Sequence, residues 1–187
     1  LTLRLNLDGL RTGQTPAPFP YRWGLRDTAM GSTHQMFRLS AVTPVIQAVD
    51  RAGKVRREWG SMKSDAETPL APGVFAYPVG IAADLRGRVI ALDSESPADA
   101  AAGPQPSSQI QVFDEDGAFL ARFGEYGHAA GQFVNPQAVA ALADGRIVVA
   151  DTGNNRLQVF APGGELPALR PLPAPTQYDA AREPQVG

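Results

Sequence analysis

The chain has no cysteine and few of the residues on which most enzyme sites depend. Without cysteine it can form no disulfide, thiol nucleophile or cysteine metal site. Its two histidines, His34 and His128, lie far apart in the sequence, whereas hydrolytic zinc sites usually take two or three. From these residue types we predict no catalytic residue and no metal ligand.

Lysine and long apolar runs are also scarce. Lys54 and Lys63 are the only lysines, and the formal net charge is −2 at pH 7, so no overall charge draws the chain to nucleic acid or to an anionic membrane. The densest basic cluster, residues 54–57, stands beside Asp50 and Glu58, which favours a solvated strand face over a phosphate site. No apolar run approaches the ~18 residues of a membrane span. We therefore expect no nucleic-acid partner and no membrane span.

Glycine and proline are plentiful, with 19 and 17 residues, and they mark many turns. Between residues 131 and 165 they separate three short runs of apolar and β-branched residues. These runs are Val139–Leu142, Ile147–Ala150 and Leu157–Phe160. Short strands closed by Asp-Gly, Gly-Asn and Pro-Gly turns predict an antiparallel meander.

The same pattern occurs earlier in the chain. Three pairs of residues are each 58 positions apart (136 − 78, 145 − 87 and 151 − 93), namely Pro78 and Pro136, Gly87 and Gly145, and Asp93 and Asp151. A partial third copy, residues 46–60, matches residues 110–124. Self-similarity at about 45 to 65 residues, with strands inside each repeat, predicts an all-β fold of β-propeller blades, each a four-stranded antiparallel meander.

Residues 136–160 resemble the NHL repeat, the blade unit of one β-propeller family. The matching features are a proline, a Gly-x-Ile-x-Val-Ala-Asp segment and an Asn-x-Arg segment that ends here in Arg156. Ala138 stands where the family has glycine, and Ser108-Gln109 replaces Asn-x-Arg in the earlier copy. The likeness covers about residues 45–165. It implies a partial NHL-like propeller whose usual role is a binding scaffold, with enzymes in a minority of relatives.

The repeats account for two complete blades and one half-recognisable blade, whereas closed propellers have about four to eight. We expect three regions: an N-terminal strand and extended proline-containing segment (1–44), the blades (45–168), and a proline-rich arm (169–187). Exposed sheet edges normally need cover. The chain is therefore a piece of a longer ring, self-associates to complete a ring, or is capped by other protein subunits.

Strand alternation in four-stranded blades places every long loop on one face and the short glycine turns on the other. Function concentrates in loops held on a rigid scaffold, so we predict binding on this long-loop face. The candidate binding residues are Tyr77, Glu95, His128, Asn135 and Asn154. A structural role is predicted for Asp93, Asp151 and Arg156, with Asp151 accepting turn amides and Arg156 pairing with a carboxylate between blades.

The function that we predict is a non-catalytic protein-interaction or scaffold module, such as an accessory subunit of a larger complex. The resemblance leaves two alternatives open: a propeller hydrolase or lyase with an oxygen-ligated metal at the ring centre, and an RNA-binding propeller. Some six-bladed relatives hold calcium, for which Glu95, Asn135 and Asp151 offer oxygen ligands, but their spacing does not require it and no cofactor is predicted. The first residue is Leu1 rather than methionine, so the location stays unassigned, with a periplasmic or secreted protein among the alternatives.

Overall fold

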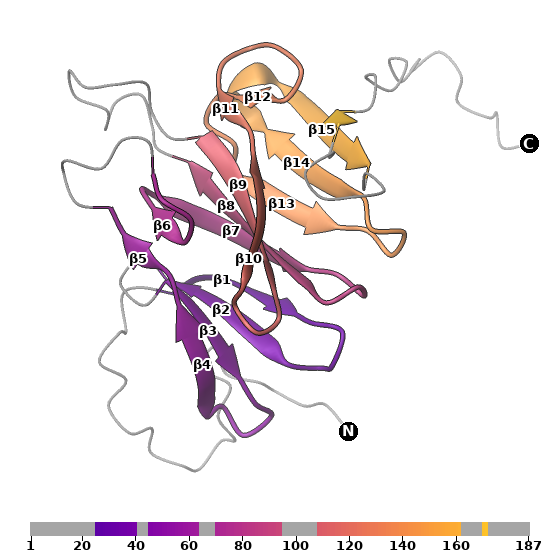
Figure 1. Cartoon of the computed structure of the whole chain (residues 1–187). Coiled ribbons are helices and arrows are strands. Elements are labelled where there is room, and N and C mark those ends of the chain that lie inside the picture. The colour runs from indigo at the N-terminus through magenta and orange to yellow at the C-terminus, as the bar shows by residue number, and fades with distance from the viewer. Residues whose placement is uncertain (1–24, 41–44, 64–69, 95–107, 162–169, 172–187) are drawn as a thin grey trace, which may run out of the picture.

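The computed structural model describes residues 25–40, 45–63, 70–94, 108–161 and 170–171. These residues form three four-stranded antiparallel sheets that follow one another along the chain (Figure 1). We refer to them as the first, second and third sheets. The predicted all-β fold of blade-like antiparallel sheets is confirmed, and the described part of the chain does not show a closed ring.

The first sheet is more complete than the sequence indicated. It has the order β1-β2-β3-β4 and consists of β1 (Leu25–Met30), β2 (Met36–Ser40), β3 (Ile46–Val49) and β4 (Val55–Trp59). Residues 1–44 are expected to be an N-terminal strand and an extended proline-containing segment, and the structure corrects the extended part at β1, which pairs with β2. The side chains of β1 are exposed or half-buried, so the strand lacks the apolar alternation that would reveal it in the sequence.

The second and third sheets correspond to the two full repeats. The second contains β7 (Pro78–Ala83), β8 (Arg88–Ser94), β9 (Ser108–Asp114) and β10 (Phe119–Phe123). The third contains β13 (Ala138–Ala141), β14 (Ile147–Asp151), β15 (Arg156–Ala161) and β16 (Arg170–Pro171). A short 3₁₀ helix, η1 (Thr152–Asn154), links β14 to β15.

The proline-rich arm contributes to the third sheet. The sequence predicts a proline-rich arm over residues 169–187, and the structure shows that its start is a strand, because β16 pairs with β15 through Pro171 opposite Phe160. Since β16 is the edge strand of its sheet, proline is tolerated there. The boundaries of the three predicted regions stay predictions.

Two short parallel ladders join one sheet to the next. β5 (Ser61–Met62) pairs with β6 (Val74–Phe75), and β11 (Glu125–Tyr126) pairs with β12 (Gln132–Phe133). In each case the chain leaving one sheet pairs with the chain entering the next. The connections between sheets are thereby fixed by main-chain hydrogen bonds at their ends.

The core lies between neighbouring sheets. One cluster joins the first and second sheets through residues that include Phe37, Ile46 and Phe113, and another joins the second and third sheets through Ile90, Ile147 and Phe160. All seven residues of β8 are buried, as expected for a strand that is covered on both faces. The middle sheet is therefore packed on both sides.

Aspartates support the hairpin turns on the face opposite the long loops. Asp84 Oδ1 accepts hydrogen bonds from the backbone amides of Arg86 and Arg88, each at 2.9 Å. The Arg88 guanidinium binds Asp84 and also donates to the carbonyl of Gly145 at 2.7 Å. This contact connects a turn of the second sheet to a turn of the third.

Candidate interaction surface

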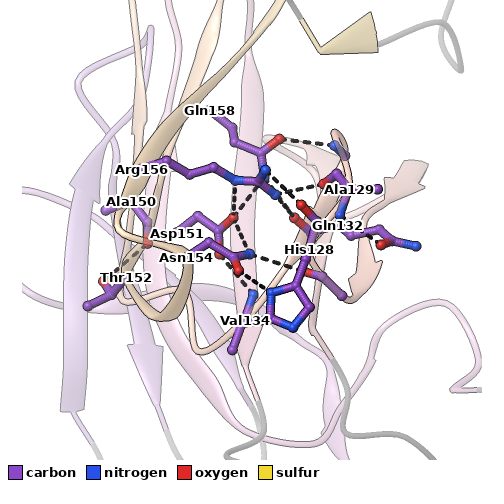
Figure 2. Close-up of polar contacts among 12 residues, drawn as sticks. His128, Ala129, Gln132, Val134, Ala150, Asp151, Thr152, Asn154, Arg156 and Gln158 are labelled. Atoms are coloured by element: carbon purple, nitrogen blue, oxygen red, sulfur yellow. Dashed lines mark hydrogen bonds and ion pairs between the residues drawn. The ribbon is translucent and has the colours of Figure 1, made fainter. Parts of the chain in front are cut away.

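A polar network is centred on Asp151, which ends β14 and is fully buried. Its Oδ1 accepts a hydrogen bond from the backbone amide of Val134 at 2.8 Å. Its Oδ2 accepts from Asn154 Nδ2 at 2.9 Å, Arg156 Nε at 2.8 Å and Gln158 Nε2 at 2.9 Å (Figure 2). A buried carboxylate is stable only when it is paired and hydrogen-bonded, and four donors satisfy that condition here.

Arg156 extends this network to the connection between the second and third sheets. While Nε pairs with Asp151, Nη1 donates to the carbonyl of His128 at 2.9 Å. Nη2 donates to the carbonyls of Ala129 at 2.6 Å and Gln132 at 2.9 Å. The carboxylate partner of Arg156 thus belongs to its own sheet, and the arginine reaches the neighbouring segment through carbonyls. This differs from the expected ion pair between blades.

Gln158, on the same strand as Arg156, also binds this connection. Its Nε2 donates to the carbonyl of Gln132 at 2.7 Å, and its Oε1 accepts from the amide of Gly131 at 3.0 Å. In the second sheet, Gln111 makes the equivalent pair of bonds to the carbonyl of Val74 and the amide of Gly73. We call this arrangement the glutamine clamp.

The glutamine clamp is not among the features that we predicted from the sequence, although its residues repeat there. The signal was present, because Gln111 and Gln158 are separated by the same 47 residues (158 − 111) that relate Phe113 to Phe160 (160 − 113). Gln47 occupies the matching place on β3. Gln111 and Gln158 are buried and Gln47 is half-buried, and a buried amide normally has fixed hydrogen-bond partners.

Two of the candidate binding residues lie together at the outer end of this network. His128 Nδ1 lies 2.7 Å from Asn154 Oδ1, and Asn154 Nδ2 also donates to the carbonyl of Gly127 at 3.0 Å. His128 is exposed, and Asn154 is half-buried. The turn that follows is completed by Asn155, which has a left-handed backbone with φ of 50°.

The other candidates lie apart from this pair or outside the described residues. Tyr77 is 39% exposed at the entry to β7, where its hydroxyl accepts a hydrogen bond from Arg26 Nη2 at 3.0 Å. The Arg26 guanidinium carbon also lies 4.7 Å from the centroid of the Tyr77 ring. Asn135 is in a left-handed turn with φ of 47° and accepts from Gln137 Nε2 at 2.6 Å. Glu95 falls outside the described part of the chain.

Asp93, the counterpart of Asp151, is also fully buried. It accepts hydrogen bonds from the amides of Ala76 at 3.0 Å and Tyr77 at 2.6 Å. In the second sheet, however, Gln109 stands where the third has Arg156 (156 − 109 = 47), and its buried Nε2 has no partner among the described residues. The residue that follows the aspartate across the hairpin therefore differs between the two sheets: it is Arg156 in the third and Gln109 in the second.

The described side chains of the Asp151 network are arranged for hydrogen bonding. Among the described residues, no group of three or more His, Asp or Glu side chains is placed to hold a metal ion. Both carboxylate oxygens of Asp151 already accept N–H donors. The described segments also contain no helix of the length and apolar character needed to cross a membrane.

Comparison with known proteins finds a family match over part of the third sheet. The NHL repeat model matches residues 133–160, which run from β12 to the end of β15. Over 55 residues the chain is 46% identical to the B-box type zinc finger protein ncl-1 of Caenorhabditis elegans and 44% identical to the Protein brain tumor of Drosophila melanogaster. Over 86 residues it is 36% identical to the E3 ubiquitin-protein ligase TRIM32 of Homo sapiens.

These similarities are partial. The matched segments cover 29%, 29% and 46% of this chain, and 6%, 5% and 12% of the three relatives, respectively. The matched repeat holds Asp151, Asn154, Arg156 and Gln158, so it includes the side chains at the centre of the network, while their main-chain partners at residues 128–132 lie just outside it. Residues 133–160 thus match an NHL repeat, and the chain is similar to short parts of three much longer proteins.

Proposed function

We propose that this chain is a protein-interaction module that binds a partner protein through the long-loop face of the third sheet. The surface consists of the connection 125–135 and the turn 152–155, with His128 and Asn154 at its centre. The observation that carries the proposal is the buried network of Asp151, which holds both segments in one arrangement.

Pre-organisation is the physical reason that such a surface suits binding. Ordering a loop on association costs free energy, and a loop that is already fixed avoids that cost. Here Arg156 and Gln158 bind four groups of the connection's main chain, while His128, Ala129 and Ala130 present their side chains to solvent. These four main-chain groups are satisfied internally, and the exposed side chains beside them are available to a partner.

The family supports a binding role and does not extend it to catalysis. NHL repeats generally serve as protein-interaction modules. The name of TRIM32 describes a ubiquitin ligase, but this chain spans 12% of that protein. Function resides in specific sites, and among the described residues no group of three or more His, Asp or Glu side chains could hold a metal ion. A scaffold role within a larger complex is the form of this function that we favour.

The ion pairs that the arginines make within the chain favour a protein partner over RNA. Phosphate binding needs several cations that converge on one surface. The arginines of the hairpin turns and of the Asp151 network instead pair with carboxylates inside the molecule, and these include Arg56, Arg57, Arg88, Arg146 and Arg156.

Site-specific photo-crosslinking tests the proposed surface. A photoreactive amino acid is placed at His128 in the full-length protein, expressed in its own cells, and a matched variant carries it at Leu85. Leu85 is 71% exposed and lies in the turn before β8, on the opposite face. We expect a discrete crosslinked partner from position 128 that is missing from position 85. Crosslinking from position 85 alone, or from neither position, would contradict the proposed surface.

A further inference from the structure

A groove runs along the outer rim between the first and second sheets, away from the surface proposed above. Its volume is about 410 Å³, and its apolar walls are Trp59 at the end of β4, Phe119 at the start of β10, and Pro72, with Phe113 at its base. We call it the rim groove. It is the outward continuation of the interface between the two sheets, because Phe113 also belongs to the core cluster that joins them.

The aromatic side chains of the rim groove form a continuous series. The ring centroids of Trp59 and Phe113 are 6.1 Å apart, and those of Phe113 and Phe119 are 5.9 Å apart in an edge-to-face arrangement. Phe113 is 1% exposed, whereas Phe119 is 39% exposed. An aromatic ring left in water at the edge of a sheet costs free energy that a ligand recovers on covering it.

Glycines keep the groove open. At Gly117, which has φ of +91°, a Cβ atom would lie 2.9 Å from Trp59 Cδ2. At Gly60, which has φ of +83°, a Cβ atom would lie 3.0 Å from the ring of Phe75. Any side chain at either position would be strained and would crowd an aromatic wall or its support.

The polar groups of the rim groove restrict its ligand. The amide of Ser61 donates to the carbonyl of Gly73 at 2.9 Å, and the amide of Gly73 donates to Gln111 Oε1 at 2.8 Å. Since these main-chain groups are paired, they offer no free strand edge for β-addition. The residues that line the groove include no charged side chain, so a neutral ligand fits it best.

We propose that the rim groove binds a proline-rich segment of a partner protein in the polyproline II conformation. Such a segment is pre-organised, carries no charge and supplies few amide donors, and aromatic-lined grooves are the surfaces that recognise it. The site goes beyond the long-loop surface and does not depend on it.

The equivalent place between the second and third sheets differs in a way that supports this assignment. There the groove is about 270 Å³ and carries Phe123 in place of Trp59, Glu125 in place of Ser61 and Ala130 in place of Pro72. It is smaller and has a carboxylate at its wall. We therefore assign proline-rich binding to the first groove.

Fluorescence of Trp59 provides the test. The chain has two tryptophans, so Trp23→Phe leaves Trp59 as the only reporter. A tryptophan-free peptide with the pattern Pro-x-Pro-x-Pro is titrated up to about 1 mM, the weak end of specific binding, beside a peptide in which alanine replaces proline. We expect a saturable change in emission with the first peptide alone.

Two neighbouring exposed residues provide matched variants. Phe119→Ala removes a wall of the groove and is expected to weaken peptide binding by about tenfold or more. Leu120→Ala, at a residue 38% exposed that does not line the groove, is expected to leave binding within about twofold. Both variants keep the core intact, so their folding can be verified by urea unfolding.

Three results would overturn the proposal: no saturable signal, equal binding of the alanine peptide, or equal effects of the two variants. The chain itself has proline-alternating runs at 16–20 and 171–175, and peptides with these sequences are included in the titration. If one of them binds more tightly than the generic peptide, a second copy of this chain replaces the partner protein as the occupant. Failure here leaves the crosslinking result at His128 unaffected.

Discussion

At the scale of single residues, the third sheet depends on one buried charge. Asp151 is fully buried and its partner Arg156 has a side chain 31% exposed. Removing one member of a buried ion pair leaves the other uncompensated, which is more costly than the net contribution of the pair. The free energy of unfolding should therefore be far more sensitive to Asp151 than to aspartates in exposed pairs.

Asp151→Asn is expected to lower the free energy of unfolding by about 3 kcal/mol. The variant retains the shape of the side chain but loses the charge that Arg156 faces. It also replaces one of the two oxygens that accept the four hydrogen bonds by an NH₂ group. Urea unfolding measures the effect. Asp116→Asn is the control, because Asp116 pairs with Arg57 where both side chains are more than half exposed, and such pairs contribute about 0–1 kcal/mol. Equal losses in the two variants would refute a special role for Asp151.

Asp50, in the turn between β3 and β4, should make the free energy of unfolding depend on pH in the acid range. Its backbone hydrogen bond from Lys54, at 3.0 Å, lowers the pKa of the carboxyl below its ordinary value, and Arg56 and the amide of Ala52 act in the same direction. Because the pKa of Asp50 is lower in the folded state than in the unfolded state, the unfolded state binds more protons at pH values between the two. The stabilisation is present above the unfolded-state pKa and is lost as the pH falls through the folded-state pKa.

The difference in unfolding free energy between the wild type and Asp50→Asn should therefore be constant between about pH 5 and 8 and should shrink from about pH 4 downward. Chemical unfolding at a series of pH values measures it. A difference that grows on acidification, or one that changes near neutral pH, would show that another group is responsible.

At the scale of elements, the glutamine clamp ties each connection to the sheet that follows it. Gln111 is fully buried, and both ends of its amide are bonded to the main chain at Gly73 and Val74. Gln111→Leu is expected to lower the free energy of unfolding by about 2 kcal/mol, since it leaves a buried donor and acceptor unpaired. Hydrogen exchange at the amide of Gly73 should be faster in this variant than in the wild type, because that amide donates to Gln111.

Gln47→Leu is the matched control on β3. The Gln47 side chain is half-buried, and its Nε2 reaches Glu58 Oε2 at 3.4 Å, a long contact. Its replacement is expected to change stability by less than about 0.5 kcal/mol. If Gln47→Leu is as costly as Gln111→Leu, the main-chain clamp is not the source of the stabilisation.

Elements that repeat were predictable from the sequence, and those that depend on tertiary contacts were not. The 58-residue offset located β8, β14 and the aspartates at their ends, because buried apolar runs and turn residues recur there. β1 was missed since its exposed side chains carry no period, and β16 was missed since a proline-rich run argues against a strand. Asn154 and His128 were both candidates, but their contact joins residues 26 positions apart and depends on the fold.

At the scale of the whole molecule, the third sheet has one face without a described neighbour. Strand register places Ala138, Ala150 and Leu157 in one row of this face, and Ala140, Val148 and Val159 in the next. The corresponding rows of the second sheet, which include Ile90, Leu92 and Ile110, are fully buried against the third sheet. The free face thus has the apolar character of a packed interface, with Leu157 61% exposed.

We expect this face to be covered in the native particle, by a further blade, by another copy of the chain or by another subunit, because apolar sheet faces and open sheet edges normally need cover. Leu157→Glu places a charge in the centre of the face. Because the side chain is already exposed, we expect a change of less than about 0.5 kcal/mol in the stability of the single chain and a loss of association, since a buried unpaired carboxylate is costly.

Sedimentation equilibrium over a range of concentrations measures the outcome. Wild-type protein should show a mass above the 19.8 kDa of one chain, alone or with its native partner, and Leu157→Glu should return that mass to one chain. Leu85→Glu, at a residue 71% exposed in a hairpin turn, should leave the mass of the wild-type particle unchanged. A wild-type mass of one chain under every condition, or a large particle that survives Leu157→Glu, would show that the third sheet is stable with its apolar face in water.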